Sequence, residues 1–175
     1  MARVVLSTAL TLNEASSARS YSPGDIVYVP GAEEEYMYAQ SYSAGAHAAR
    51  VGQPGLWDSV NKRFKVTATA TIERNTCETG FAQAAITNLY YGLWLIKGDM
   101  ALVYKEGAAV VAWQPFVINS AATGSYYVID NFGPNSGISR RHIGHILSAS
   151  AGKMTAKAGT KGAAAGSAKI HAYGW

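Results

Sequence analysis

The residues with the best spacing for chemistry lie late in the chain. Residues 148–155 read SASAGKMT, which ends like a phosphate-binding P-loop. That motif needs a glycine five positions before Gly152, where this chain has Leu147, and a metal-binding hydroxyl residue where it has Met154. Without that glycine the loop cannot wrap its backbone amides around a phosphate. We therefore exclude a nucleotide site of this type.

The four histidines are candidate metal ligands. His142 and His145 are three residues apart and would share a face on a helix. The surrounding Ile and Leu residues favour a strand instead, where positions i and i+3 face opposite sides. No acidic residue follows Asp130, although the fold could bring one close, and His47 and His171 have no motif partner. We favour a structural or exposed role over a metal site.

The other reactive residue types form no catalytic pattern. Glu33-Glu34-Glu35 follow a turn glycine, so a solvated turn is a simpler interpretation than a carboxylate pair for acid–base work. Cys77, in RNTCETG, has no catalytic histidine signature near it, and no serine lies in a G-x-S-x-G elbow. We predict that the chain is not an enzyme and uses no cofactor or metal.

Length and composition indicate one globular domain made in a cytoplasm. The chain has 175 residues, of which 49% are hydrophobic and 15% charged. Its single cysteine excludes an intramolecular disulfide framework and fits a reducing compartment. No run of 18 apolar residues occurs, so we predict no membrane contact by a spanning segment. Polar residues interrupt the apolar N-terminal run, so we expect a mature start rather than a signal peptide.

Charge is distributed unevenly. Residues 1–130 hold nine Lys/Arg and eleven Asp/Glu, a net charge of −2, whereas residues 131–175 hold six Lys/Arg and no acid, a net charge of +6. Such asymmetry can indicate a nucleic-acid contact. The basic residues are dispersed, however, and form no compact Lys/Arg run. We favour a solvated edge or an acidic protein partner and predict no nucleic-acid partner.

Short strands dominate the local patterns. In RFKVTATATI (63–72), apolar and polar residues alternate strictly, which is typical of a half-buried strand. Similar short runs, bounded by turn residues, occupy 26–29, 35–40, 100–104, 115–119, 125–130 and 142–150. Helical periodicity is poor, and residues 81–90 could form one or two turns at most. The pattern predicts an all-β fold, a single small β-barrel or β-sandwich with short Gly-rich turns.

We divide the chain into three parts. Residues 1–22 are an N-terminal arm or first strand, 23–150 the β domain, and 151–175 a flexible segment rich in Ala, Gly and Lys. Within that segment, 151–167 are expected to be a mobile loop and AKIHAY (168–173) a possible last strand. Four glycines are candidates for turns or close backbone approach: Gly24, Gly92, Gly98 and Gly124. We expect YGLWLI and MALVY to pair as a hairpin turning at Lys97-Gly98-Asp99.

Aromatic residues are the remaining functional candidates. Most should be buried, because aromatic rings pack well across strands. In adjacent pairs within a strand, however, one ring tends to face outward, and outward Tyr and Trp are typical interface anchors. The candidate protein-contact residues are Tyr90, Tyr91, Trp94, Trp113, Tyr126 and Tyr127.

The order of several short motifs resembles the small capsid-decoration (cement) proteins of tailed phages. The sequence runs through YSPGDIVYVPGAEEEYMYAQ, GFAQAAITNLYYGLWLIKGDMALVY, PFVINSAATGSYYVID and IGHILSAS. The matching positions are Gly24-Asp25, Tyr36/Tyr38/Gln40, Tyr91-Gly92, Gly98/Ala101/Val103, Thr123-Gly124 and Ile143-Gly144/Leu147. The resemblance covers most of residues 20–150. The tail and the aromatic pairs depart from it, so contacts made there cannot be carried over.

The resemblance implies a virion structural protein without catalysis. Such a protein is made in the host cytoplasm, binds the major capsid protein on the outer face of the head, and stabilises the shell, often as a homotrimer. Two other classes stay open from the residues. A carbohydrate-binding or head-fibre adhesin domain would use the outward aromatic rings. A nucleic-acid-associated β-barrel would combine the basic C-terminal third with stacking by Tyr and Trp.

Overall fold

The computed structural model describes residues 3–5, 12–29, 31, 33–67, 78–104, 113, 115–120, 127–131, 144–149 and 167–173. They form twelve strands and no helix, which confirms the predicted all-β class. The strands are β1 (Arg3–Val5), β2 (Ala15–Ser16), β3 (Ile26–Tyr28), β4 (Glu35–Tyr42), β5 (Pro54–Asp58), β6 (Arg63–Lys65), β7 (Thr79–Ala82), β8 (Tyr91–Tyr104), β9 (Pro115–Ser120), β10 (Tyr127–Asn131), β11 (Gly144–Ala149) and β12 (Ser167–Tyr173). No helix in this part of the chain is long and apolar enough to cross a membrane.

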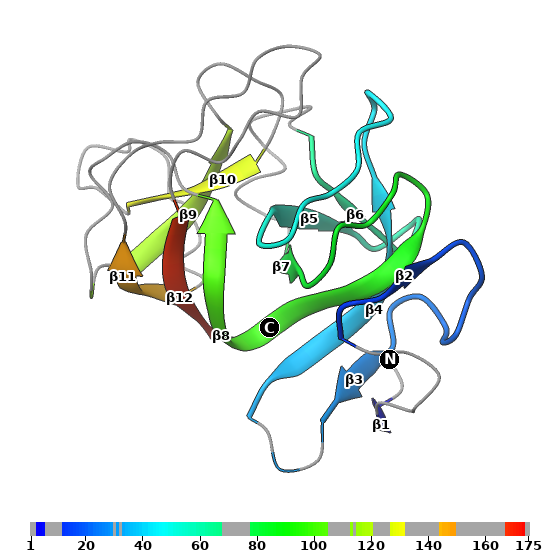
Figure 1. Cartoon of the computed structure of the whole chain (residues 1–175), viewed down its shortest axis with the longest axis horizontal. Coiled ribbons are helices and arrows are strands. Elements are labelled where there is room, and N and C mark those ends of the chain that lie inside the picture. Colours follow the sequence, from blue (N-terminus) through cyan, green and yellow to red (C-terminus); the bar gives the residue numbers. More distant parts are fainter. Residues whose placement is uncertain are drawn as a thin grey trace.

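Five of the strands pair in a ring. β4 pairs with β6, β6 with β5, β5 with β7, β7 with β8, and β8 returns to β4. Beyond this ring, β3 and β1 continue the sheet from β4, while β12, β11, β9 and β10 continue it from β8. Figure 1 shows β8 as the long strand that joins the two groups. Whether the whole domain is best described as a barrel or a sandwich stays a prediction.

Alternate residues of the ring strands enter two cores. In β4 the odd-numbered residues from Met37 enter one core and the even-numbered residues from Tyr36 enter the other, as a strand period of two requires. The ring core contains Met37, Ala39, Ala49, Trp57, Phe64, Val66, Ala82, Ala84, Ile86, Trp94 and Ile96. The shared core contains Val27, Tyr36, Tyr38, Leu56, Phe81, Tyr91, Leu93, Leu95, Met100, Ile146, Ile170 and Ala172, and so joins the ring to β3, β11 and β12.

The predicted hairpin at residues 97–99 is wrong. Residues Tyr91–Tyr104 form one strand of 14 residues, and its two apolar runs are two arms of the same strand. Its register with β4 ends at Lys97, and its register with β12 begins there. Gly98 has a φ of 110°, a conformation that glycine adopts without steric cost. This residue lets β8 bend and change partners where a hairpin was expected (Figure 1).

The sequence patterns missed β5 and β7. β5 contains a proline and a glycine, and β7 a glycine, so neither carries a strong strand signal. Gly55 and Gly80 are direct partners in the pairing of these two strands. A Cβ atom on Gly80 would lie 2.7 Å from Cζ of Phe64, and one on Gly55 would lie 2.9 Å from Cζ3 of Trp94. Both glycines therefore make room for buried aromatic rings.

The N-terminal part of the chain lies against the ring. β2 pairs with Tyr91 and Gly92 of β8, and β1 pairs in parallel with β3. The hydroxyl of Tyr38 accepts a hydrogen bond of 2.9 Å from the backbone N–H of Ser20. The Tyr21 ring meets the Tyr38 ring edge-on at 5.3 Å. Part of the predicted arm is therefore packed on the domain.

Other expected elements have mixed outcomes. The last strand expected at 168–173 is present as β12, which lies between β8 and β11. The strand expected at 63–72 contains β6, where Phe64 is buried between the half-buried Arg63 and Lys65, but residues 68–72 lie outside the described residues. Residues 81–90 contain the end of β7 and turns, with no helical turn. The loop expected at 151–167 lies outside the described residues except for Ser167.

Candidate functional site

Two of the predicted contact residues are buried, which corrects the prediction. Trp94 has no exposed surface, and its ring stacks on Phe64 with centroids 4.6 Å apart. Tyr91 is 8% exposed and stacks on Tyr38, with centroids 5.9 Å apart. Its hydroxyl accepts a hydrogen bond of 2.9 Å from Nε of Arg19. Both residues belong to β8, whose two faces are covered by the two cores, so neither can contact a partner.

The other predicted contact residues differ in position. Tyr90 is 38% exposed and Trp113 is 75% exposed. Tyr127 begins β10, where the structure describes its backbone, and Tyr126 lies outside the described residues. Only Tyr90 and Trp113 are thus placed as surface residues.

The candidate glycines also differ in their roles. Gly24 has a φ of 98° in the turn before β3, as expected for a turn glycine. Gly92 lies within β8 and is not a turn residue. A Cβ atom on Gly92 would lie 2.7 Å from Cδ1 of Ile86, so its role is close packing. Gly124 lies outside the described residues.

The most clearly built surface feature is the turn Thr87–Tyr90, which we call the Leu89 turn. The N–H of Tyr90 donates to the carbonyl of Thr87 at 2.9 Å and closes the turn. Leu89 and Tyr90 exchange backbone hydrogen bonds with Ser41 of β4, both at 2.8 Å. The side chain of Asn88 accepts a 2.7 Å bond from the N–H of Ser43. The turn is therefore fixed to the ring at several points.

This fixed turn exposes an apolar side chain in an unfavourable backbone conformation. Leu89 has a φ of 68°, which costs a residue with a side chain about 1–2 kcal/mol. Its carbonyl accepts a further hydrogen bond of 2.8 Å from Nε2 of Gln40. The Leu89 side chain is nevertheless 52% exposed. Local strain that the surroundings hold in place is a feature of binding sites, so we regard this turn as the leading functional candidate.

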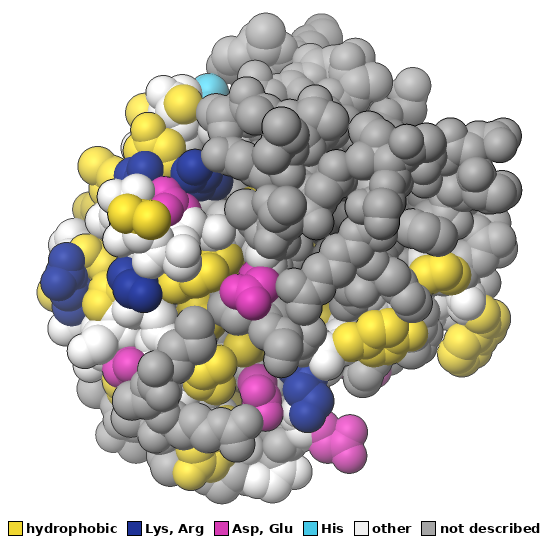
Figure 2. All heavy atoms as spheres, turned by 180° about the vertical axis from the view of Figure 1, so that it is seen from behind, with side chains coloured by type: hydrophobic (Ala, Val, Ile, Leu, Met, Phe, Trp, Pro, Cys, Tyr) yellow, Lys and Arg dark blue, Asp and Glu magenta, His cyan; other side chains and the backbone are white. Residues whose placement is uncertain are grey.

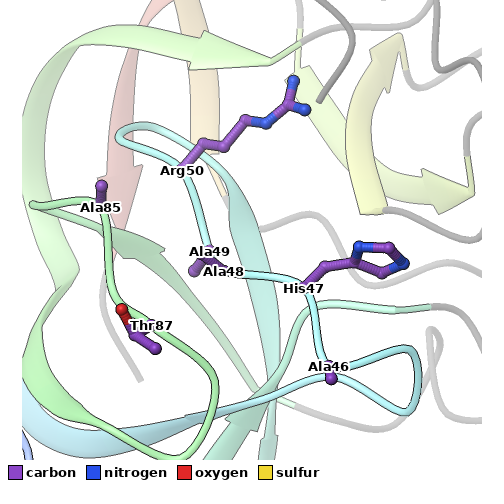
Figure 3. A pocket seen from close by; sticks show the side chains of 7 residues that line it. All are labelled: Ala46, His47, Ala48, Ala49, Arg50, Ala85 and Thr87. Carbon is purple, nitrogen blue, oxygen red and sulfur yellow. The ribbon is translucent and has the colours of Figure 1, made fainter. Parts of the chain in front are cut away.

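A hollow lies directly beside the Leu89 turn. It has a volume of about 370 Å³ and is lined by Ala46, His47, Ala48, Ala49, Arg50, Ala85 and Thr87. Two loops form this lining, residues 46–50 and residues 85–87. Figure 3 shows the short side chains of Ala48 and Ala49 on the first loop and of Ala85 and Thr87 on the second, with His47 and Arg50 extending from the first loop. We call this feature the Ala49 hollow. Its lining is mostly small and apolar, and it includes two basic residue types and no carboxylate.

Hydrogen bonds hold the loop that forms one wall of this hollow. Ala49 and Ile86 exchange backbone bonds of 2.8 and 3.0 Å. The N–H of Arg50 donates to Oε1 of the buried Gln53 at 3.0 Å, and the N–H of Gln53 donates to the carbonyl of Arg50 at the same distance. The Ala49 hollow and the Leu89 turn thus sit on one fixed framework at the same end of the ring.

A charged cluster at the β5–β6 turn has a structural role. Burial raises the pKa of Asp58, but hydrogen bonds from Asn61 and Arg63 and the charge of Lys65 outweigh it and hold the pKa below its usual value. The Asp58 carboxylate accepts from the side chain of Asn61 at 2.8 Å and from Nε of Arg63 at 3.2 Å. These bonds order the turn, at whose tip Val60 is 87% exposed.

Among the residues with described side chains, no group of three His, Cys, Asp or Glu could hold a metal ion.

On the face drawn in Figure 2, described hydrophobic side chains form separate groups, with Lys, Arg, Asp and Glu among them. On this face, apolar contact area is therefore offered at discrete places and not as one continuous patch. Sequence patterns missed the Leu89 turn because Leu89 looks like part of the following strand, although Asn88 is a typical turn residue.

Comparison with protein-family models, with curated proteins and with solved structures finds no match for this chain. The likeness to phage decoration proteins therefore rests on the order of the sequence motifs and stays a prediction.

Proposed function

We propose that the chain is a virion structural protein that binds the outer face of a phage head and stabilises it. The observation that carries the proposal is the Leu89 turn, a preformed apolar contact fixed to an all-β framework and placed beside a hollow. A rigid surface of this kind loses little conformational entropy on binding. The order of the sequence motifs supports a capsid as the partner. The chain would be made in the host cytoplasm and act on the capsid exterior.

Repetition explains how a small contact can be sufficient. A shell offers many identical sites, and linked copies raise the effective affinity without new contacts. We propose a homotrimer as the form that binds, on the strength of the family resemblance. Light scattering of the free protein, and of protein released from heads, measures the number of copies. Only monomers in both samples would contradict the trimer.

The experiment is a co-sedimentation titration with heads assembled without this chain. Leu89→Asn is the informative variant, because asparagine tolerates a positive φ better than leucine and removes the apolar contact. Fully burying a leucine contributes about 1.5–3 kcal/mol. Because Leu89 is 52% exposed, about half of this contribution is left to gain on binding, so we expect binding to weaken about 4- to 12-fold. Val60→Asn is the matched control, since Val60 is also exposed and apolar but lies on a different turn. This control should bind like the parent chain.

A salt series separates a shell from nucleic acid as the partner. If six basic residues of 131–175 neutralised duplex phosphates, the log–log salt slope would be about −5. A contact through apolar groups is screened far less. Binding to heads that persists at high salt agrees with the proposal. Steeply salt-dependent DNA binding without head binding contradicts it.

One observation favours a second candidate, a carbohydrate-binding domain. Trp113 is 75% exposed and has a φ of 67°, while its N–H is fixed to the carbonyl of Ile146 at 2.6 Å. An exposed indole on an anchored backbone could stack on a sugar ring. A glycan array tests this candidate: saturable glycan binding that Trp113→Ala abolishes would favour it over the shell.

A further inference from the structure

Three hydrogen bonds in series connect the Arg19 side chain to the Leu89 turn. The carbonyl of Leu89 accepts from Nε2 of Gln40 at 2.8 Å, and the same Nε2 donates to the hydroxyl oxygen of Tyr91 at 3.4 Å. That hydroxyl also accepts a bond of 2.9 Å from Nε of Arg19. Arg19, Gln40 and Tyr91 come from three separate segments of the chain and lie together beside the turn. We call these three residues the Arg19 network.

Both the backbone and the side chain of Arg19 are held in place. The hydroxyl of Tyr38 accepts from the N–H of Ser20 at 2.9 Å and donates to the carbonyl of Ala18 at 3.4 Å. These two bonds hold the backbone on either side of Arg19. Cζ of Arg19 lies 5.2 Å from the centroid of the Tyr91 ring, within the range of a cation–π contact. The buried rings of Tyr38 and Tyr91 stack on each other, so Arg19 is ordered before any partner binds.

The guanidinium of Arg19 keeps donors for a partner. Arginine carries five N–H donors in a planar fork, and the bond to Tyr91 uses only the one on Nε. The edge formed by the two terminal nitrogens stays able to bind a carboxylate through two parallel bonds. The ion pairs seen between described residues use three other basic side chains, those of Arg63, Lys65 and Lys97. Arg19 is also exposed, so a partner can reach it.

We propose that Arg19 provides the polar contact of the surface around the Leu89 turn and binds the carboxylate of an aspartate or glutamate on the partner. This inference rests on the proposed function and specifies its partner. The shell would carry an acidic side chain for Arg19 next to an apolar side chain for Leu89. Arginine is enriched among the residues that dominate binding at interfaces. Tyr91 is buried, so it positions Arg19 without contacting the partner itself.

The charge of this surface favours a protein carboxylate over the phosphates of a nucleic acid. Duplex nucleic acid is bound by several basic side chains that follow the phosphates. The Arg19 network provides one cation, and the neighbouring Leu89 and Tyr90 are uncharged and 52% and 38% exposed. One fixed guanidinium beside exposed apolar area suits a partner with one carboxylate. Complementary charge of this kind mainly gives specificity and faster association.

The test is a co-sedimentation titration of the parent chain and Arg19→Gln with heads assembled without this chain, either native or amidated. In amidated heads, carbodiimide and glycinamide have converted surface carboxylates to neutral amides, and electron microscopy shows that the shells are intact. On native heads, Arg19→Gln should bind about 5- to 10-fold more weakly than the parent chain, because its lost hydrogen bonds are charge-assisted but partly exposed. On amidated heads the two chains should bind equally weakly, since the carboxylate that distinguishes them is gone.

Lys62→Gln is the matched control, because it removes the same charge from an exposed residue on the turn between β5 and β6. It should bind native heads like the parent chain. Because Arg19 is exposed, circular dichroism of Arg19→Gln should show an unchanged fold. Equal binding of native heads by the parent chain and the folded Arg19→Gln variant overturns the inference and leaves the proposed function standing. A difference between them that survives amidation does the same. Absence of head binding by the parent chain contradicts the proposed function and, with it, this inference.

Discussion

Gly80→Ala tests the packing of the ring core most directly. The added methyl group would lie 2.7 Å from Cζ and 2.9 Å from Cε1 of Phe64, and 3.1 Å from Cβ of Trp94. Phe64 cannot move aside easily. It has no exposed surface, stacks on Trp94 and meets the Trp57 ring with centroids 5.1 Å apart. The substitution therefore overfills the space that the glycine leaves.

The expected magnitude follows from two opposing effects. Overpacking a well-filled core lowers the free energy of unfolding by about 1–3 kcal/mol. Replacing glycine by alanine also reduces the entropy of the unfolded chain, which adds back about 0.4–1 kcal/mol. We expect a net loss of about 1.5 kcal/mol, equivalent to a fall in melting temperature of about 3–6 °C for a chain of this length.

The assay is urea unfolding followed by tryptophan fluorescence, with an unchanged m-value as the sign that only stability has changed. A double-mutant cycle with Phe64→Leu identifies the cause, because the smaller side chain removes the ring atoms that the methyl group meets. In that background Gly80→Ala should cost about 1 kcal/mol less. The reasoning would be refuted if Gly80→Ala lowered the free energy of unfolding equally in the parent chain and in the Phe64→Leu variant, or if it stabilised the parent chain.

Three further predictions concern single residues. Burial, and secondarily the charge of Glu34, raises the pKa of Tyr36 to about 12. The contribution of neutral Tyr36 to the free energy of unfolding is complete below pH 10 and is lost as the pH rises towards 12. In an alkaline titration, Tyr36→Phe should therefore unfold at a higher pH than the parent chain. Because the pKa of Asp58 is lowered in the folded state, ionised Asp58 stabilises the fold above about pH 4, and this stabilisation is lost as the pH falls through the pKa of the folded state. Asp58→Asn should therefore be less stable than the parent chain at neutral pH. In urea melts at several pH values, the difference in the free energy of unfolding should shrink on acidification. Gly98→Ala should destabilise more than Gly31→Ala in thermal melts, because both have positive φ but only at Gly98 would a Cβ atom meet another residue, at 2.7 Å from Cγ of Glu34; equal losses would show that backbone strain alone matters.

Local periodicity by itself predicts most of the strands and the all-β class. The run EYMYAQ lies in β4, PFVIN in β9, and AKIHAY in β12, because each keeps strand-forming residues between turn signals. A period of two is a property of consecutive residues, so sequence alone reveals it. The same property gives the two-sided burial of β4, where Met37 and Tyr38 enter different cores.

The candidate surface was only partly predictable. The rule that adjacent tyrosines in a strand divide between its two faces names Tyr90 as a contact residue, but Tyr90 is exposed because it lies in the Leu89 turn, before β8 begins. Leu89 could not be named, since a leucine at positive φ has no sequence signal, and the turn exists only because Ser41, Gln40 and Ser43 of the distant β4 region bind it. From the sequence, Trp94 is equally suitable for a surface. Only the closure of the five paired strands places its indole against the Phe64 side chain.

Strand pairing is what the tertiary structure alone decides. The glycine of KGD is compatible with a tight turn and with a bend, and the choice depends on whether residues 100–104 meet β12 or fold back on residues 91–96. The same pairing places His171 beside both His145 and Asp99, three residues that the sequence leaves without a common motif. Such contacts depend on the free energy of pairing segments tens of residues apart, which no local pattern contains. The sequence therefore determines which segments are strands and which of their faces are apolar, whereas the structure determines which strands are neighbours.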